Sequence, residues 1–185
     1  MRTSKGKSYV SSAEEFAQYR KQLKLLPCAH CRAVGALIGH GYLRGYGTKG
    51  HEKIRRGWRI FCSNRGRRKG CGRTYSVLLA QFAPRYLVPA EILFRFIHAV
   101  RKGLTRKAAW ERMFVPWTLQ TGYRIWQRLC RRQSPLRSRL WERTPPPACP
   151  SPQPLFQLID HLTLAFSNHA CPIVAFHLHF QQPFL

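Results

Sequence analysis

Residues 62–75 read CSNRGRRKGCGRTY, in which Cys62 and Cys71 enclose four basic residues. A second pair, Cys28 and Cys31, lies upstream in the segment PCAHC with C-x2-C spacing. Zn²⁺ in structural sites takes four ligands in a tetrahedron, and two short segments distant in the chain commonly supply two thiolates each. The four cysteines therefore predict one tetrathiolate zinc site, and Zn²⁺ is the cofactor that we expect.

Other assignments of these cysteines and of nearby histidines stay open. The four could instead be separate core residues, because a free cysteine behaves as a small buried hydrophobe. His30, His40 or His51 could replace one sulfur, since imidazole is also a zinc ligand. The other cysteines are isolated in the sequence and are interpreted as structural: Cys130, Cys149 and Cys171.

The sequence around the second cysteine pair has the two-residue period of β-strands. Trp58 and Ile60 alternate with their neighbours in GWRIFC, and Tyr75 and Val77 do so in RTYSVLL. Glycines on both sides of the last cysteine permit close backbone approach and a positive φ, as a tight metal-binding turn requires. The pattern indicates a small β zinc ribbon over residues 27–87, which zinc would stabilise in place of a large core.

The segment between the last two ligands is basic and has no carboxylate to neutralise it. Neither Asp nor Glu occurs between Lys53 and Glu91. A solvated surface loop is the plain interpretation, but cations without local acidic partners are better suited to phosphate groups. We therefore predict DNA contacts from the loop residues Arg65, Arg67, Arg68, Lys69 and Arg73.

The whole chain is strongly basic. Its 185 residues include 32 Lys and Arg against 7 Asp and Glu, for a formal net charge of +25, and 44% are hydrophobic. Uncompensated charge of one sign opposes folding by self-repulsion, so a polyanionic partner is the simplest reason for it. No secretory signal or run of about 20 apolar residues is present. We expect a folded cytoplasmic, nucleoid-associated protein that binds double-stranded DNA and no membrane.

The period changes to that of helices over residues 88–144. Apolar positions recur at helical spacing in 89–103, 105–114 and 118–132, separated by a glycine and a proline. Three short helices with a basic third helix predict a helix-turn-helix, although a three-helix bundle with a solvated basic face stays open. The third helix would read bases through Gln120, Thr121 and Arg124 and meet phosphates through Arg128 and Arg131.

The flanking segments complete an α+β prediction. Residues 1–26 combine a basic arm with a helix whose capping box is Ser12 and Glu15, and Ser134 with Pro135 predicts the start of another short basic helix. Residues 145–154 are rich in proline and indicate a stiff linker. The apolar segment 155–185 begins with helical period, while IVAFHLHF fits a strand or a helix. That segment would dock on the bundle or on a partner.

With these motifs in place, CAHC…RIFCSNRGRRKGCGRTYS resembles the zinc-ribbon segments of bacterial insertion-sequence transposases, and the following helices resemble the helix-turn-helix of transposases and recombinases. The resemblance covers about residues 27–144 and is closest to small mobile-element proteins. It implies binding at transposon ends or regulation of the element. The chain departs from the family in its long second cysteine spacing, and its single aspartate and six glutamates do not form the carboxylate triad of a catalytic domain.

The function expected is therefore non-catalytic, zinc-dependent DNA binding. Four other functions stay open: an RNA-binding or ribosome-associated zinc ribbon, a remnant or subunit of a transposase or recombinase, an enzyme such as a tyrosine recombinase or strand-transfer nuclease, and an adaptor. In the last case the apolar C-terminal segment would recruit a separately encoded transposase or recombinase.

Overall fold

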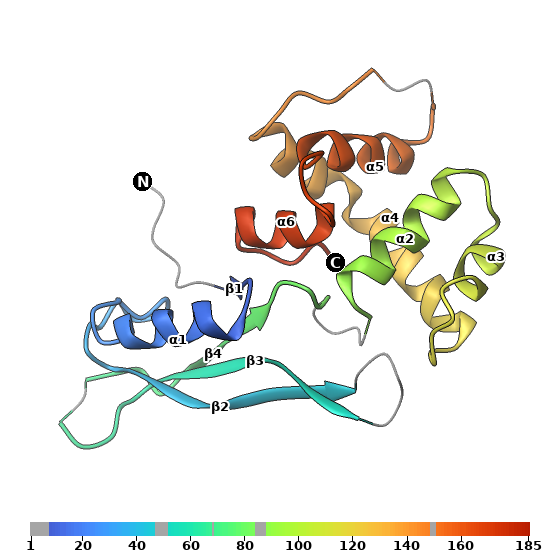
Figure 1. Cartoon of the computed structure of the whole chain (residues 1–185). Helices are drawn as coiled ribbons and strands as arrows, with labels where there is room; N and C mark the ends of the chain where they lie inside the picture. The colour runs from blue at the N-terminus through green and yellow to red at the C-terminus, as the bar shows by residue number, and fades with distance from the viewer. Residues whose placement is uncertain (1–7, 47–51, 68, 84–87, 149–150) are drawn as a thin grey trace. The chain divides into compact units, whose positions relative to one another are not determined.

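The computed structural model describes residues 8–46, 52–67, 69–83, 88–148 and 151–185 (Figure 1). Within these residues the protein is α+β, with a mixed four-stranded sheet and six helices. The chain divides into two compact units. The described part of the first, the sheet unit, ends at Ala80, and that of the second, the helical unit, begins at Gln81.

The sheet unit contains the sheet and one helix (Figure 1). The strand order is β1-β4-β3-β2, with β1 parallel to β4 and the other two pairs antiparallel. The elements are β1 (Tyr9–Val10), α1 (Ala13–Gln22), β2 (Leu37–Tyr46), β3 (Lys53–Cys62) and β4 (Thr74–Leu79).

Helix α1 covers the apolar face of this sheet. Trp58 and Ile60 are buried on β3, as the alternation of a strand implies. Tyr75 on the neighbouring strand β4 pairs with Ile60. The ring of Phe16 on α1 stacks on Trp58 with centroids 4.0 Å apart, and the hydroxyl groups of Tyr19 and Tyr75 lie 3.3 Å apart. Aromatic packing of this kind contributes beyond the area that it buries.

The start of α1 is fixed by the predicted cap. The Ser12 hydroxyl accepts a hydrogen bond from the Glu15 N–H at 3.2 Å. The Glu15 carboxylate turns back to accept from the N–H and the hydroxyl of Ser11, both at 2.7 Å. The capping motif is therefore present, with the return bond made one residue earlier than in the usual box.

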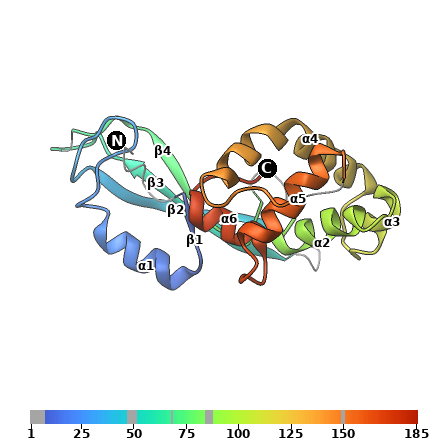
Figure 2. The same cartoon turned by 90° about the horizontal axis from the view of Figure 1, so that it is seen from above.

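The helical unit holds the remaining five helices around one core (Figure 2). They are α2 (Ala90–Arg101), α3 (Arg106–Glu111), α4 (Leu119–Trp141), α5 (Pro154–Ala165) and α6 (Pro172–Phe180).

Helix α4 is longer than the sequence predicts. The prediction that a separate helix starts at Ser134 and Pro135 is wrong, because α4 runs through both residues without a break. A proline removes one intrahelical hydrogen bond, and a cost of about 3 kcal/mol is expected in a helix interior. Leu129, Leu136 and Leu140 are fully buried at helical spacing on either side of the proline, so core packing keeps the chain helical.

The C-terminal segment is part of the same core. Both α5 and α6 are helical, which settles the strand-or-helix alternative for IVAFHLHF. Helix α5 packs beside α2 and α4, and α6 packs beside α2 and α5 (Figures 1 and 2). Leu158, Phe176 and Phe184 are completely buried in it. The apolar surface that the sequence left without a partner is therefore covered by the helical unit itself.

Among the described residues, no helix combines the length and the apolar character that crossing a bilayer requires.

Candidate metal centre and basic surfaces

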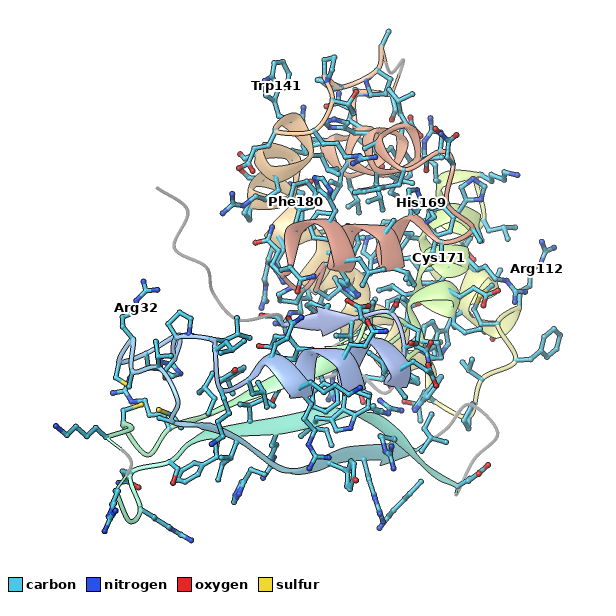
Figure 3. All side chains as sticks on the ribbon, turned by 60° about the vertical axis from the view of Figure 1, so that its left-hand side comes forward. Arg32, Arg112, Trp141, His169, Cys171 and Phe180 are labelled. Carbon is cyan, nitrogen blue, oxygen red and sulfur yellow. The ribbon has the colours of Figure 1, made fainter. Side chains whose placement is uncertain are left out.

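The four cysteines singled out from the sequence meet at one end of the sheet unit, where Figure 3 shows their sulfur atoms in yellow. All four Sγ atoms lie within 4.8 Å of one another. The Sγ atoms of Cys28 and Cys71 are 3.9 Å apart, and those of Cys31 and Cys62 are 3.7 Å apart. A tetrahedral Zn²⁺ site with Zn–S bonds of about 2.3 Å has sulfur–sulfur edges of about 3.8 Å. The cluster therefore has the dimensions of a tetrathiolate metal site.

The first pair sits in a tight turn between α1 and β2. The Cys28 N–H donates to the Ala33 carbonyl and the Arg32 N–H donates to the Cys28 carbonyl, both at 3.0 Å. Arg32 has φ 65°, a left-handed conformation that reverses the chain after Cys31. Its exposed side chain, labelled in Figure 3, extends outward at the end of the unit that holds the sulfur atoms. The turn directs both thiols to one point.

The second pair joins the end of β3 to the loop before β4. The Gly72 N–H donates to the Cys62 carbonyl at 2.9 Å, and Gly72 has φ 71°. A Cβ atom on Gly70 would overlap the Ser63 carbonyl oxygen and stand 2.8 Å from the Cys62 Sγ. The sequence predicted that glycines here permit close backbone approach and a positive φ. Gly70 provides the close approach, and Gly72 adopts the positive φ.

Each pair also directs a backbone N–H at a sulfur. The His30 N–H donates to the Cys28 Sγ at 3.4 Å, and the Cys71 N–H donates to the Cys62 Sγ at 3.3 Å. Such bonds stabilise thiolate over thiol. They satisfy part of the negative charge that a tetrathiolate site carries.

The thiol pKa values show why a cation suits the cluster. Burial works to raise the pKa of Cys28, but the N–H groups of Cys31 and His30, together with the thiols of Cys62 and Cys31, bring this pKa down to about 7. Burial and the neighbouring thiols raise the pKa of Cys62 to about 12. The protein alone thus favours a thiolate at Cys28 and opposes one at Cys62. A divalent metal would supply the positive charge that holds all four sulfurs as thiolates.

The alternative ligands lie apart from the cluster or outside the described residues. Among the described residues, the four cysteines are the only group of three or more His, Cys, Asp or Glu side chains near enough to share a metal. The His40 ring packs on Phe61 at 5.2 Å, and His30 is exposed in the first turn. His51 and Cys149 fall outside the described residues, and Cys130 and Cys171 are half-buried in the helical unit.

The basic loop, residues 65–73, begins after Cys62 and runs past Cys71 to the residue before β4, and its described charged side chains are open to solvent. Among the described part of this loop, no side chain of its cations forms an ion pair. The Arg65 N–H donates to the Ser63 hydroxyl at 3.3 Å, and its guanidinium lies 6.0 Å from the centre of the Phe61 ring. Arg68 lies outside the described residues. The exposed cations are Arg65, Arg67, Lys69 and Arg73.

The proposed base readers lie at the start of α4. Gln120 and Arg124 are exposed one helical turn apart, and Thr121 is half-buried with its N–H bonded to the Thr118 carbonyl at 2.9 Å. Further along the helix, Arg131 is exposed and Arg128 is half-buried. The structure therefore places these residues along one helix.

The connection between α3 and α4 differs from a standard helix-turn-helix. It occupies residues 112–118, whereas the usual turn has about three or four residues. The indole N–H of Trp110 donates to the Trp117 carbonyl at 3.2 Å and ties α3 to the end of this connection. The helix pair is held together, but by a longer link than the sequence analogy predicts.

Two basic hollows were not identified from the sequence. In the helical unit, a hollow of about 410 Å³ is lined by Arg95, His98, Lys102 and Arg112 together with apolar side chains; Figure 3 labels Arg112. Burial, followed by Lys102 and Arg101, lowers the pKa of His98. Arg95 and His98 on α2 and Lys102 directly after it recur at helical spacing, which could have predicted this face. The second hollow lies in the sheet unit between α1 and the strands β2 and β3.

Comparisons with protein-family models, with curated proteins and with solved structures give no match for this chain.

Proposed function

We propose that this protein is a non-catalytic, zinc-dependent protein that binds double-stranded DNA and serves a mobile genetic element, by binding transposon ends or by regulation. One observation carries the proposal: the sulfur cluster joins the two ends of an exposed basic loop that has no carboxylate. Such a loop, fixed at its base, presents cations to phosphate groups at a lower entropic cost than a free one.

Zinc is the metal that we propose because of the donor set. Four thiolates in a tetrahedron suit Zn²⁺ or the iron of an iron–sulfur site, and a closed four-cysteine site is typical of structural zinc. Structural zinc contributes about 10–16 kcal/mol of apparent binding free energy in small zinc-finger peptides. That amount can hold together a unit whose described core contains one small sheet and one helix.

The DNA contacts divide by chemistry. Cations of the basic loop meet phosphates, which fix position without reading sequence. Arg128 and Arg131 do the same from α4, while Gln120, Thr121 and Arg124 reach base edges in the major groove. The exposed positions of Gln120 and Arg124 support this assignment.

The engaged carboxylates support a non-catalytic role. Asp160 receives two hydrogen bonds from the Arg101 guanidinium, at 3.0 and 2.8 Å, and Glu142 pairs with Arg139 at 2.5 Å. A two-metal strand-transfer site needs convergent carboxylates to hold both ions. Supercoiled plasmid incubated with the protein and Mg²⁺ should stay intact. Nicking activity that co-purifies with the protein would overturn the proposal that the protein is non-catalytic.

The mobile-element role and a separately encoded transposase or recombinase as partner rest on the sequence resemblance. Phe176 and Phe184 are buried in the helical unit, so these two side chains are not available to recruit a partner. A recombinase gene beside the coding sequence, and its co-purification with this protein, would support the partnership.

The test of DNA binding is its salt dependence. With about eight phosphate contacts, log K should fall against log salt with a slope near −7 between about 50 and 200 mM, as measured by anisotropy of a labelled duplex. Replacing Arg65, Arg67, Lys69 and Arg73 together by Gln should reduce the slope by about 3 to 4. Arg139→Gln removes a cation already paired with Glu142 and serves as the control. A flat salt response would overturn the proposal.

Competition distinguishes the RNA-binding alternative. Unlabelled duplex DNA should displace the labelled duplex at lower concentration than structured RNA of equal length. The reverse order would favour the ribosome-associated or RNA-binding function.

A further inference from the structure

A groove of about 480 Å³ lies between α1 and the strands β2 and β3 of the sheet unit, away from the basic loop in sequence. Its floor is the stacked pair Phe16 and Trp58, whose ring planes differ by only 8°. Its α1 side carries Arg20 and Lys21, and its strand side carries Tyr42 and Arg55. The groove therefore joins an apolar, aromatic floor to a basic rim.

The strand side owes its composition to an irregularity of the sheet. Tyr42 pairs with Trp58 across β2 and β3, so both side chains share one face. The register then shifts between Leu43 and Arg44, because Leu43 pairs with Gly57 and Arg44 with Arg55. The extra residue reverses the alternation and brings Arg55 to the face of Tyr42 and Trp58. Its guanidinium lies 4.2 Å from the Tyr42 ring centre and 6.0 Å from that of Trp58.

Small residues keep the groove open. Ala13 and Ala17 line it from α1, one helical turn apart. A smaller hollow of about 160 Å³ adjoins it and shares Phe16, Arg20 and other residues with it, while Gly39 and Gly41 supply its β2 side. A Cβ atom on Gly39 would stand 3.6 Å from the Arg20 Nε, so the Arg20 side chain lies across this glycine.

The lining matches a nucleotide with an exposed base. None of the described residues that line the groove carries a carboxylate, and three carry a positive charge: Arg20, Lys21 and Arg55. Tyr42 is 51% exposed, so part of its ring is accessible to a ligand. Base stacking on an aromatic ring, with an arginine beside it and cations along the backbone, is the common scheme for single-stranded nucleic acid.

We propose that this groove binds a single-stranded nucleic-acid segment, with one base stacked on Tyr42 and Arg55 and the adjoining phosphates on Arg20 and Lys21. Bases in a duplex are stacked on each other and cannot reach the Tyr42 ring. The site is thus chemically separate from the phosphate contacts of the basic loop, and it does not depend on them.

The test uses the full-length, zinc-loaded protein and labelled oligomers of deoxythymidine and uridine of about 15 nucleotides. Tyr42→Ala should weaken binding of the preferred oligomer by about 5- to 150-fold, and Tyr42→Phe should retain most of it. If the wild-type protein binds the deoxythymidine oligomer more tightly, the natural strand is DNA. If it binds the uridine oligomer more tightly, the natural strand is RNA. Phe114→Ala removes an aromatic side chain that is 94% exposed in the helical unit, so it is the matched control and should bind as wild type.

Binding measurements with duplex DNA distinguish a failure of this proposal from a failure of the proposed function. Tyr42→Ala should bind duplex DNA as the wild type does, while the four-fold Gln variant of the basic loop should lose duplex affinity and keep the Tyr42-dependent single-strand contact. Arg55→Gln should weaken single-strand binding in the same direction as Tyr42→Ala. Metal content and far-UV circular dichroism equal to wild type establish that the variants fold. Unchanged single-strand affinity in folded Tyr42→Ala would overturn the proposal, whatever the result with duplex DNA.

Discussion

Gly122 on α4 lies against the indole ring of Trp110 on α3, so closely that a Cβ atom on Gly122 would stand 2.7 Å from the Trp110 Cδ2 atom. Both residues are buried. The contact lets the two helices approach where α4 begins, two residues from both Gln120 and Arg124. A glycine in the interior of a helix therefore has a packing role here.

Gly122→Ala should destabilise the helical unit although alanine is the better helix former. The gain in helix propensity is about 1 kcal/mol, whereas forcing a methyl group into a closely packed site costs about 1–3 kcal/mol. We expect a lower thermal midpoint, measured by circular dichroism at the helix band. Gln120→Ala, exposed two residues earlier, should shift stability by less than about 0.5 kcal/mol. A higher midpoint for Gly122→Ala would show that the helices have room to move apart.

Cys71→Ser should release the metal and unfold residues 27–80 while leaving the helical unit largely intact. Without the fourth thiolate the site loses most of its affinity, and metal binding and folding are coupled in small zinc units. Elemental analysis should find about one zinc per wild-type chain and little in the variant. Cys130→Ser makes the same change outside the cluster and should keep its zinc. Full metal content in Cys71→Ser would show that the ligand assignment is wrong.

Gly70→Ala tests the backbone of the second turn without removing a ligand. The added methyl group would meet the Ser63 carbonyl oxygen and the Cys62 Sγ, so the turn must open. We expect weaker zinc retention in competition with a chelator. Gly66 has a positive φ of 62° and open space around it, so Gly66→Asn is a suitable control that should retain zinc. Equal retention by both variants would contradict the close approach at Gly70.

The cysteine spacing predicted the sulfur cluster because a metal fixes its ligands by chemistry that is visible in sequence. The alternation around Trp58 likewise predicted a strand there, and β3 is that strand. The shift at Arg44 and Arg55 could not be predicted, because a bulge is decided by strand pairing across the sheet rather than by local period.

Long-range packing also determines where α4 ends and how the C-terminal segment is covered in the helical unit. Pro135 reads locally as a helix start, yet buried leucines on both sides carry α4 through it. The sequence of residues 155–185 indicates an apolar segment, but it does not indicate which surface covers that segment. The covering surface comes from α2 and α4, which lie elsewhere in the chain. Sequence patterns thus identified most of the elements and the four cysteines that cluster, while the basic groove on α1 could be recognised only from the fold.

Acidification should destabilise the helical unit in part through His98. Burial is the main cause that lowers the pKa of this imidazole, followed by Lys102 and Arg101, and Asp160 acts in the opposite direction. The folded pKa therefore lies below the unfolded value of about 6.5. The unfolded chain binds the proton more readily, so the stability from neutral His98 is present above about pH 6.5 and is lost as the pH falls toward the folded pKa. An NMR titration should find the His98 imidazole pKa below 6.5.

The matched variant is His98→Asn, which removes the titrating group. Between about pH 7.5 and pH 5 the wild-type unfolding midpoint should fall further than that of the variant. Because both proteins carry the same cysteine cluster, acid loss of metal affects them alike and cancels from the difference between them. A folded-state pKa above 6.5 would reverse the sign, since the charged imidazole would then be favoured by Asp160 despite burial beside Lys102 and Arg101.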